Sequence, residues 1–417
     1  MNIAIFSRST VKHFTSGGME THLKNLAEGL VQIGNKVSVI TTAVQGAKGR
    51  SGYEKFTEHG VDYFYINDTT PGLNPITSWE MMFVSVGLMK RTTGGEGGKN
   101  YFIESLKVFN ELDDKKKFDL VVSQSTVARG ILGEKHPPIV SIIHGTITNE
   151  IKNRFKANKS LLNWGRFLGI DIPRWYYELL TSNREFFKKV DEVIAVSSDL
   201  KKKFLTEHPY CESKTEVIYN GVDSDVFKPG GKKFPVFTIL YIGRMEREKG
   251  VDLIIKSVHE LVKKGLKVNA CMIGSGIHLS EFKKITDSLN LNEHVDFLGQ
   301  IKNEDLVKYY QQSHVFVLPT RREEGHPMTI SEAFCCGLPV IATKKGGLAE
   351  LVEDRKTGFF VNENDYLDLS EKISLLYSDA SLLSDIEKAT AETGKKKYSR
   401  NAMILEYQKV FKSLAKF

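Results

Sequence analysis

The sequence has few cysteines and no long apolar run. Its four cysteines show neither Cys-x-x-Cys spacing nor a histidine partner pattern, which argues against a disulfide framework or a zinc site. No segment approaches the roughly 18 uninterrupted apolar residues that a membrane helix needs. Arg8 interrupts the first apolar run almost at once, which is not typical of a signal peptide. We therefore expect a cytoplasmic protein.

An excess of charge of one sign is also missing. Lys and Arg number 58 and Asp and Glu 51, so the net charge is only +7 over 417 residues, which does not indicate a nucleic-acid partner. The densest basic cluster, residues 150–167, interleaves Lys and Arg with aromatic residues. With the aromatic stretch 76–92, region 150–180 suggests peripheral contact with an anionic membrane at the cytoplasmic face. A solvated amphipathic helix explains it equally well, and binding to anionic vesicles at low salt distinguishes the two.

Two familiar site motifs are incomplete. No glycine cluster completes Gly-x-Gly-x-x-Gly, and the GSG of residues 274–276 is followed by Ile-His-Leu, which disfavours a nicotinamide-dependent oxidoreductase. The DSD of residues 223–225 has the spacing of a metal-binding Asp-x-Asp but belongs to an Asn-Gly-Val-Asp stretch. We expect neither a metal nor a cofactor.

Short β-rich segments alternate with helical segments along the whole chain. The first group is NIAIFS, KVSVITT, VDYFYIN, FDLVVSQ, PIVSIIHG and DEVIAVSS, and the second is FTILYIGR, VNACMIGSG, HVDFLGQ, HVFVLPT, PVIAT and GFFV. This is the α/β pattern of parallel sheets covered on both faces. The sequence therefore predicts two doubly wound, Rossmann-like domains, residues 1–210 and 211–397. A helix over about 398–417 is expected to complete the first domain.

Positive charge lies just ahead of a predicted helix in YIGRMEREKGVDLIIKSV, residues 241–258. Arg244 and Lys249 follow a buried strand and Gly243, so an anion there would meet backbone N–H groups, a guanidinium and an ammonium. The alternative is a solvated loop whose charges pair with Glu246 and Glu248.

Two acidic residues flank the start of another predicted helix in RREEGHPMTISEAFCCGLPVIAT, residues 321–343. Glu324 lies in the loop after a strand, whereas Glu332 lies inside a helix that begins near Pro327 and ends at Gly337. This spacing favours two anchors on separate hydroxyl-bearing parts of one ligand over an acid and nucleophile pair. Alternatively, Glu332 pairs with a neighbouring side chain.

Two features of the first half allow a binding or a structural interpretation. Gly17 and Gly18 join a strand to a helix, either to let a ligand reach the backbone or to form a turn with positive φ. His144 ends another strand, either facing a ligand or with its hydrogen bonds satisfied inside the protein.

In four motifs the chain resembles retaining glycosyltransferases of the GT-B fold, in particular family GT4. Glu324 and Glu332 match the E-x7-E signature, and GRMEREKG matches the diphosphate clamp. VIYNGVDSDVF matches the interdomain Asn-Gly-Val-Asp stretch, and GGMETH the N-terminal glycine loop. The motifs occur in the family's order, and the resemblance covers nearly all of the chain. It implies two Rossmann-like domains facing across a cleft.

The resemblance also implies roles for individual residues. Arg244 and Lys249 would hold the donor diphosphate, Glu332 the ribose hydroxyls, and Glu324 the donor hexose, while His144 would face the sugar from the first domain. The other positions implied to contact the donor are Gly17, Gly18, Gly243, Gly325, His326, Pro327, Met328 and Thr329.

The implied activity is a retaining, metal-independent transfer of a hexose-type sugar from a UDP- or GDP-linked donor. The acceptor would be the hydroxyl of a saccharide or lipid-linked molecule, in cell-surface polysaccharide, glycolipid or lipid-linked glycan synthesis. An epimerase of the same fold would convert the donor alone, and an inactive binding protein would tolerate loss of Glu324. The chain has His326-Pro327 where many members have Phe-Gly, and Tyr219 where Pro is frequent, so the sugar is not predicted.

Overall fold

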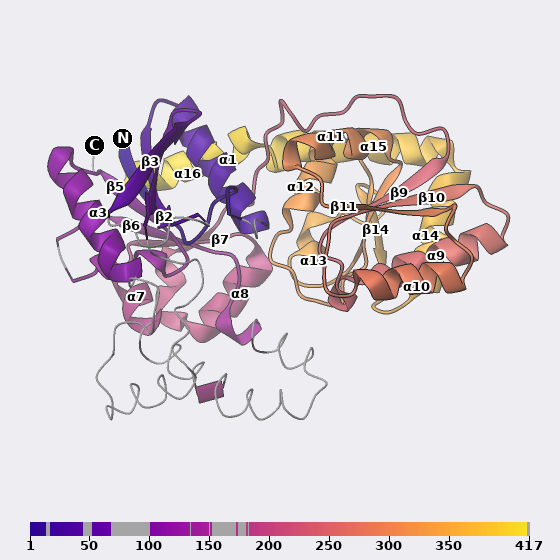
Figure 1. The fold of residues 1–417 in the computed structure, drawn as a ribbon, viewed down its shortest axis with the longest axis horizontal. Coiled ribbons are helices and arrows are strands. Elements are labelled where there is room, and N and C mark those ends of the chain that lie inside the picture. The colour runs from indigo at the N-terminus through magenta and orange to yellow at the C-terminus, as the bar shows by residue number, and fades with distance from the viewer. Residues whose placement is uncertain are drawn as a thin grey trace. The chain divides into compact units, whose positions relative to one another are not determined.

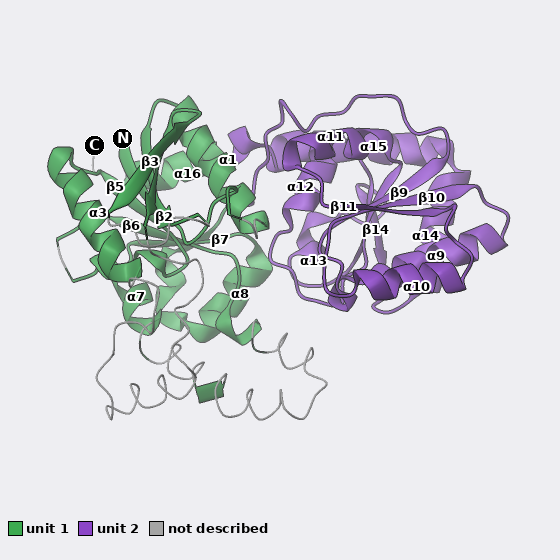
Figure 2. Ribbon diagram, in the orientation of Figure 1, with its two compact units in different colours: residues 1–218, 404–417 green, residues 219–403 purple. Residues whose placement is uncertain are grey.

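The computed structural model of the protein describes residues 1–13, 17–44, 52–67, 101–133, 135–149, 151, 172–173, 181 and 183–414. Contacts divide the chain into two compact units, Met1–Ile218 with Ile404–Phe417, and Tyr219–Met403 (Figure 2). The last helix, α16 (Arg400–Leu414), begins in the second unit and continues into the first. Region 76–92 lies outside the described residues, as does region 150–180 apart from Ile151, Ile172 and Pro173.

The first unit contains an eight-stranded sheet in the order β3-β4-β2-β1-β5-β6-β7-β8, parallel except for the β3–β4 pair. Its strands are β1 (Asn2–Phe6), β2 (Lys36–Thr42), β3 (Tyr53–Glu58), β4 (Val61–Ile66), β5 (Leu120–Gln124), β6 (Ile139–Ile143), β7 (Glu192–Ala195) and β8 (Thr215–Val217). Its α-helices include α1 (Gly18–Gln32), α3 (Tyr101–Lys115), α7 (Asn183–Lys189) and α8 (Ser198–Glu207). Each β-rich segment expected in this half contains a strand, and β1, β5 and β6 are wholly buried, as strands inside a parallel sheet are.

Two edge strands of this sheet were not predicted. β3 reads YEKFTE and is mostly exposed, so it lacks the apolar pattern that identifies a buried strand. β8 has only three residues. Both depend on pairing with a neighbouring strand rather than on their own composition.

The second unit contains a six-stranded parallel sheet in the order β11-β10-β9-β12-β13-β14. Its strands are β9 (Phe237–Ile242), β10 (Val268–Ile273), β11 (Val295–Gly299), β12 (Val315–Leu318), β13 (Val340–Thr343) and β14 (Gly358–Val361), all predicted. Its helices are α9 (Val251–Lys263), α10 (Leu279–Ser288), α11 (Asn303–Gln312), α12 (Met328–Cys335), α13 (Leu348–Leu351), α14 (Tyr366–Ser378) and α15 (Ala380–Lys397). Figure 1 shows α9 and α10 on one face of this sheet and α11 and α15 on the other.

Both sheets are doubly wound, which confirms the predicted fold class. In the second sheet the strand order reverses direction between β9 and β12, and in the first between β1 and β5. Ligands of open α/β sheets bind beyond the carboxyl ends of the strands at such a switch point. The loops after these four strands are therefore where a site is expected. Among the described residues, no helix is long and apolar enough to cross a bilayer.

Candidate functional site

The loops after β9 and β12 bring a lysine and a glutamate together. Lys249 ends the short 3₁₀ helix Arg247–Lys249 ahead of α9, and Glu324 lies in the loop between β12 and α12. Lys249 Nζ lies 2.6 Å from Glu324 Oε1, and the two side chains are 15% and 14% exposed. The second unit therefore places a largely shielded ion pair at its switch point, although 75 residues separate the partners in sequence.

Arg321 joins the two loops that carry this ion pair. Its guanidinium donates to both carboxylate oxygens of Asp252, in the first turn of α9, at 2.7 and 2.8 Å. Its backbone N–H donates to Glu248 O at 2.7 Å, and Thr320 Oγ1 donates to the same carbonyl at 3.1 Å. Because a bidentate Arg–carboxylate pair is directional, these contacts fix the spacing of the two loops.

Gly243 and Arg244 directly follow β9. A Cβ at Gly243 would lie 2.8 Å from the Tyr241 hydroxyl, and this hydroxyl donates to Arg244 O at 2.8 Å, so a side chain at Gly243 would disturb the turn. The Arg244 guanidinium pairs with Glu246 at 2.8 Å, and its side chain is 57% exposed. Exposed ion pairs contribute little free energy, so an anion could readily displace Glu246 from Arg244.

The GSG segment of residues 274–276 supports this turn from the neighbouring strand. A Cβ at Gly274 would lie 2.0 Å from Gly243 O, and one at Gly276 would lie 2.5 Å from Met245 O. Close backbone packing therefore explains the glycines at positions 274 and 276 without a dinucleotide motif.

Glu332 is buried in α12 and 2% exposed. Tyr310, on α11, donates its hydroxyl to Glu332 Oε2 at 2.6 Å, and Asn303 Nδ2, from the same helix, donates to Oε1 at 3.2 Å. Burial raises the pKa of the Glu332 carboxyl, while these two hydrogen bonds act in the opposite direction. Both carboxylate oxygens thus have partners inside the second unit, as in the alternative interpretation of this residue. Its role on ribose hydroxyls stays a prediction.

The other residues predicted around the donor sugar form the entry to α12. Pro327 is the N-cap of this helix and Met328 its first residue. The helix therefore begins one residue later than it would if Pro327 were its first residue. The first N–H groups of a helix have no acceptor within it, and here they belong to Met328 and Thr329. Gly325 and His326 connect these residues to Glu324.

His326 is buried and holds the α12 entry against the Asn-Gly-Val-Asp stretch. Its Nε2 lies 2.7 Å from Ser331 Oγ, and its Nδ1 accepts from the Asn220 backbone N–H at 3.3 Å. The Asn220 side chain donates in turn to His326 O at 3.0 Å. The Asp223 carboxylate, part of the DSD spacing, pairs with Arg400 at 2.8 Å. The Asn-Gly-Val-Asp stretch is therefore held in place by contacts with other residues of the protein.

Gly17 and Gly18 precede and begin α1 in the first unit. Gly17 has φ −147° and ψ −158°, so a turn with positive φ is the wrong explanation for Gly17. A Cβ there would lie 3.5 Å from Glu20 Oε2, an ordinary contact. Glu20 caps the helix, because its Oε2 accepts from Gly17 N–H at 2.7 Å. Among the described residues nothing requires glycine at position 17, and the idea that a ligand approaches this backbone stays a prediction.

His144 follows β6, and its imidazole is hydrogen-bonded to β5, the neighbouring strand. Nε2 lies 2.7 Å from Gln124 Oε1, which assigns the proton to Nε2. The ring also contacts His22 of α1, with 4.9 Å between ring centroids. Burial lowers the pKa of His144 to about 4. The side chain is therefore a neutral imidazole whose Nδ1 carries a lone pair.

This arrangement predicts how His144 responds to pH. The pKa of His144 is about 4 in the folded protein, against about 6.5 in an unfolded chain. The unfolded chain therefore binds a proton at this residue at a higher pH than the folded protein does. The free energy of unfolding should fall as the pH drops from about 6.5 to about 4. We expect ¹⁵N NMR of labelled histidine, assigned with His144→Gln, to find a neutral Nε2–H tautomer at pH 6. Gln124→Glu should raise the pKa of His144. Titration of His144 near pH 6.5 in the unmodified protein would contradict this description.

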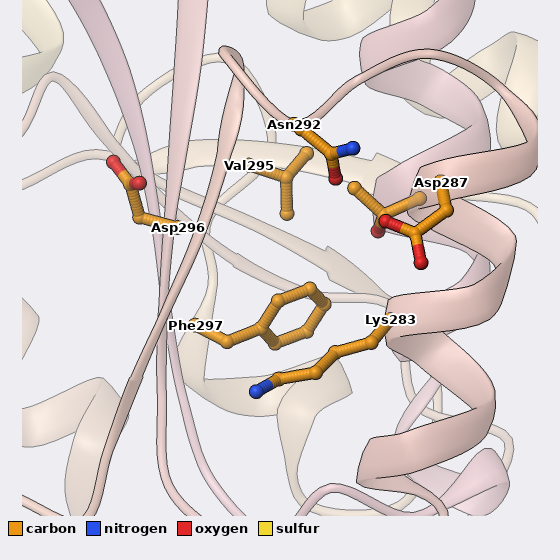
Figure 3. A pocket seen from close by; sticks show the side chains of 7 residues that line it. Lys283, Asp287, Asn292, Val295, Asp296 and Phe297 are labelled. Carbon is orange, nitrogen blue, oxygen red and sulfur yellow. The ribbon is translucent and has the colours of Figure 1, made fainter.

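A cavity of about 240 Å³ lies elsewhere in the second unit, between α10 and β11. Figure 3 shows the Phe297 ring and the Lys283 side chain lying close together in it, with Asp287, further along α10, and Asn292 above them. It includes none of the predicted site residues. The candidate site is therefore defined by the switch-point contacts and not by this cavity.

Comparison with known proteins identifies the family of the chain. The family description "Glycosyltransferase Family 4" matches residues 16–226, and "Glycosyl transferases group 1" matches residues 224–393. An uncharacterised glycosyltransferase of Methanocaldococcus jannaschii is 27% identical over 327 residues, covering 76% of this chain and 82% of that protein. The capsular polysaccharide biosynthesis glycosyltransferase CapM of Staphylococcus aureus is 29% identical over 245 residues, covering 54% and 62%.

A solved structure has a similar fold. Anabaena HepE, crystallised with UDP, aligns with a TM-score of 0.68 and 16% identity, covering 99% of this chain and 100% of that one. The two family matches together run from residue 16 to residue 393. The chain therefore belongs to glycosyltransferase family 4 and is a glycosyltransferase of the GT-B fold.

Proposed function

We propose that the protein is a retaining glycosyltransferase that moves a hexose-type sugar from a UDP- or GDP-linked donor to a hydroxyl acceptor. The acceptor is a saccharide or a lipid-linked molecule, and the product is a cell-surface polysaccharide, a glycolipid or a lipid-linked glycan. The name of the relative CapM and the UDP in the HepE structure support this substrate class. A lipid-linked acceptor at the cytoplasmic face of a membrane is the hypothesis suggested by the sequence of residues 150–180.

The contact between Lys249 and Glu324 is the observation that carries this proposal. A nucleotide sugar has a diphosphate joined directly to a ring with hydroxyl groups. An ammonium suits the first part and a carboxylate the second, and here the two lie 2.6 Å apart at a switch point. Arg244, in the same loop as Lys249, adds a second cation.

The proposed reaction needs stabilisation of the leaving group's negative charge. As the bond from the anomeric carbon to the phosphate oxygen breaks, Arg244, Lys249 and the first N–H groups of α12 stabilise the departing diphosphate. We therefore expect the reaction to need no metal ion. The acceptor hydroxyl attacks from the same face, forms the new carbon–oxygen bond, and gives its proton to the departing phosphate. Attack from the face that the phosphate leaves retains the anomeric configuration.

A thermal-shift screen of nucleoside diphosphates tests the donor site. We expect UDP or GDP to raise the melting temperature of the unmodified protein, and the nucleotide that does so identifies the donor class. Arg244→Ala should abolish the shift, because it removes the guanidinium that contacts the diphosphate. Lys283→Ala, in the cavity beside α10, is the control and should leave the shift unchanged. An unchanged response in Arg244→Ala would remove the diphosphate assignment.

A further inference from the structure

Both cations proposed to hold the diphosphate have a carboxylate partner in the protein. Arg244 pairs with Glu246 at 2.8 Å, and Lys249 pairs with Glu324 at 2.6 Å. A diphosphate that binds these cations must therefore compete with two carboxylates and displaces them where it takes over their hydrogen bonds. The free energy of that displacement depends on how strongly each carboxylate is held.

The two pairs differ in burial. The Arg244 side chain is 57% exposed and Glu246 is 20% exposed, so water and salt screen their attraction. Lys249 and Glu324 are 15% and 14% exposed, and charges shielded from water attract more strongly and are more costly to leave without a partner. Glu246 is thus the weaker competitor for a diphosphate, and Glu324 the stronger one.

We propose that Glu324 determines specificity by competing with the diphosphate for Lys249, which makes the site favour the intact donor over free nucleoside diphosphate. This inference rests on the proposed function. When an intact nucleotide sugar binds, the phosphates replace Glu324 at Lys249, and the sugar hydroxyls donate hydrogen bonds to the released carboxylate. Free nucleoside diphosphate has no sugar beyond its second phosphate, and its ribose hydroxyls are expected at Glu332. It therefore leaves the shielded Glu324 carboxylate with only the contact from Thr320 Oγ1, at 3.5 Å.

The consequence concerns the product of transfer. After the sugar has left, the nucleoside diphosphate no longer satisfies Glu324, and the carboxylate returns to Lys249. Glu324 therefore favours release of the product, in addition to contacting the sugar. Its loss should strengthen binding of the product and weaken binding of the donor.

Calorimetric titration with UDP and GDP separates these effects. We expect Glu324→Gln to bind the preferred nucleoside diphosphate at least about fivefold more tightly than the unmodified protein, which corresponds to about 1 kcal/mol. Glu246→Gln is the matched control, since it removes the same charge from the other cation, and its gain should stay below about twofold. In a Lys249→Met background, Glu324→Gln should bring no gain. UDP-glucose and GDP-mannose, titrated in parallel, should bind Glu324→Gln more weakly than the unmodified protein.

The possible results separate this inference from the proposed function. Binding of UDP or GDP to the unmodified protein with no gain in Glu324→Gln overturns the competition and leaves the function standing. A gain that persists without Lys249, or an equal gain in Glu246→Gln, also overturns it. If neither nucleotide binds the unmodified protein or Glu324→Gln, both proposals fail. Glu324→Ala serves the same purpose should the Gln variant not fold.

Discussion

Replacing Lys249 by Met should lower the rate of sugar transfer by about 100- to 1,000-fold, the usual loss when one group that stabilises developing negative charge is removed. The change should also lower stability, because Glu324 is left as a shielded carboxylate without its 2.6 Å partner. Since the pair is partly exposed, we expect about 1 to 3 kcal/mol of destabilisation, below the range for a fully buried pair. Steady-state kinetics, with the donor found in the thermal-shift screen, measures the loss of rate. Chemical denaturation measures the loss of stability.

A double variant separates the chemical effect from the structural one. Lys249→Met with Glu324→Gln removes both charges, so stability should largely return while the rate stays low. Lys256→Met is the matched control, because Lys256 lies on the exposed side of α9 and its loss should change the rate less than about twofold. If the double variant recovers the rate together with the stability, the role of Lys249 is structural.

The two ion pairs of the site differ in whether the sequence predicts them. Arg244 and Glu246 are two residues apart, and their pairing was one of the interpretations of this loop. The same interpretation placed the partners of both cations within the loop, at Glu246 and Glu248, but Lys249 pairs with Glu324. That contact depends on the adjacency of β9 and β12, which is a property of strand order. A periodicity that identifies each strand does not say which strands are neighbours.

Side-chain contacts between different helices and loops of the second unit could not be predicted from the sequence. Glu332 was recognised by its spacing from Glu324, but its partners Tyr310 and Asn303 lie on another helix, and no local pattern connects them to it. Arg321 and Asp252 were likewise not assigned a role, because a bidentate ion pair between a loop and the first turn of α9 leaves no periodic signal. By contrast, the core strands were predicted because burial on both faces requires continuous apolar runs.

Gly250→Ala should lower both stability and donor binding, because this glycine holds Lys249 in place. Gly250 has φ +75°, and a Cβ there would lie 2.1 Å from Pro319 O. An alanine must therefore bear the left-handed conformation, about 1 to 2 kcal/mol, and push away the backbone just after β12, about 1 to 3 kcal/mol more. That backbone leads to Glu324, so the displacement should also separate the carboxylate from Lys249.

Gly265→Ala is a closely matched control for this prediction. Gly265 has φ +76°, nearly the same conformation, but no atom lies within 4 Å of the position of its Cβ. It should therefore bear only the conformational cost and keep full nucleotide binding. We expect thermal unfolding to place Gly250→Ala well below Gly265→Ala, and the thermal shift with UDP or GDP to be lost only in Gly250→Ala. Equal melting temperatures and equal nucleotide shifts would mean that the contact between Gly250 and Pro319 does not position Lys249, because conformation alone would then explain both variants.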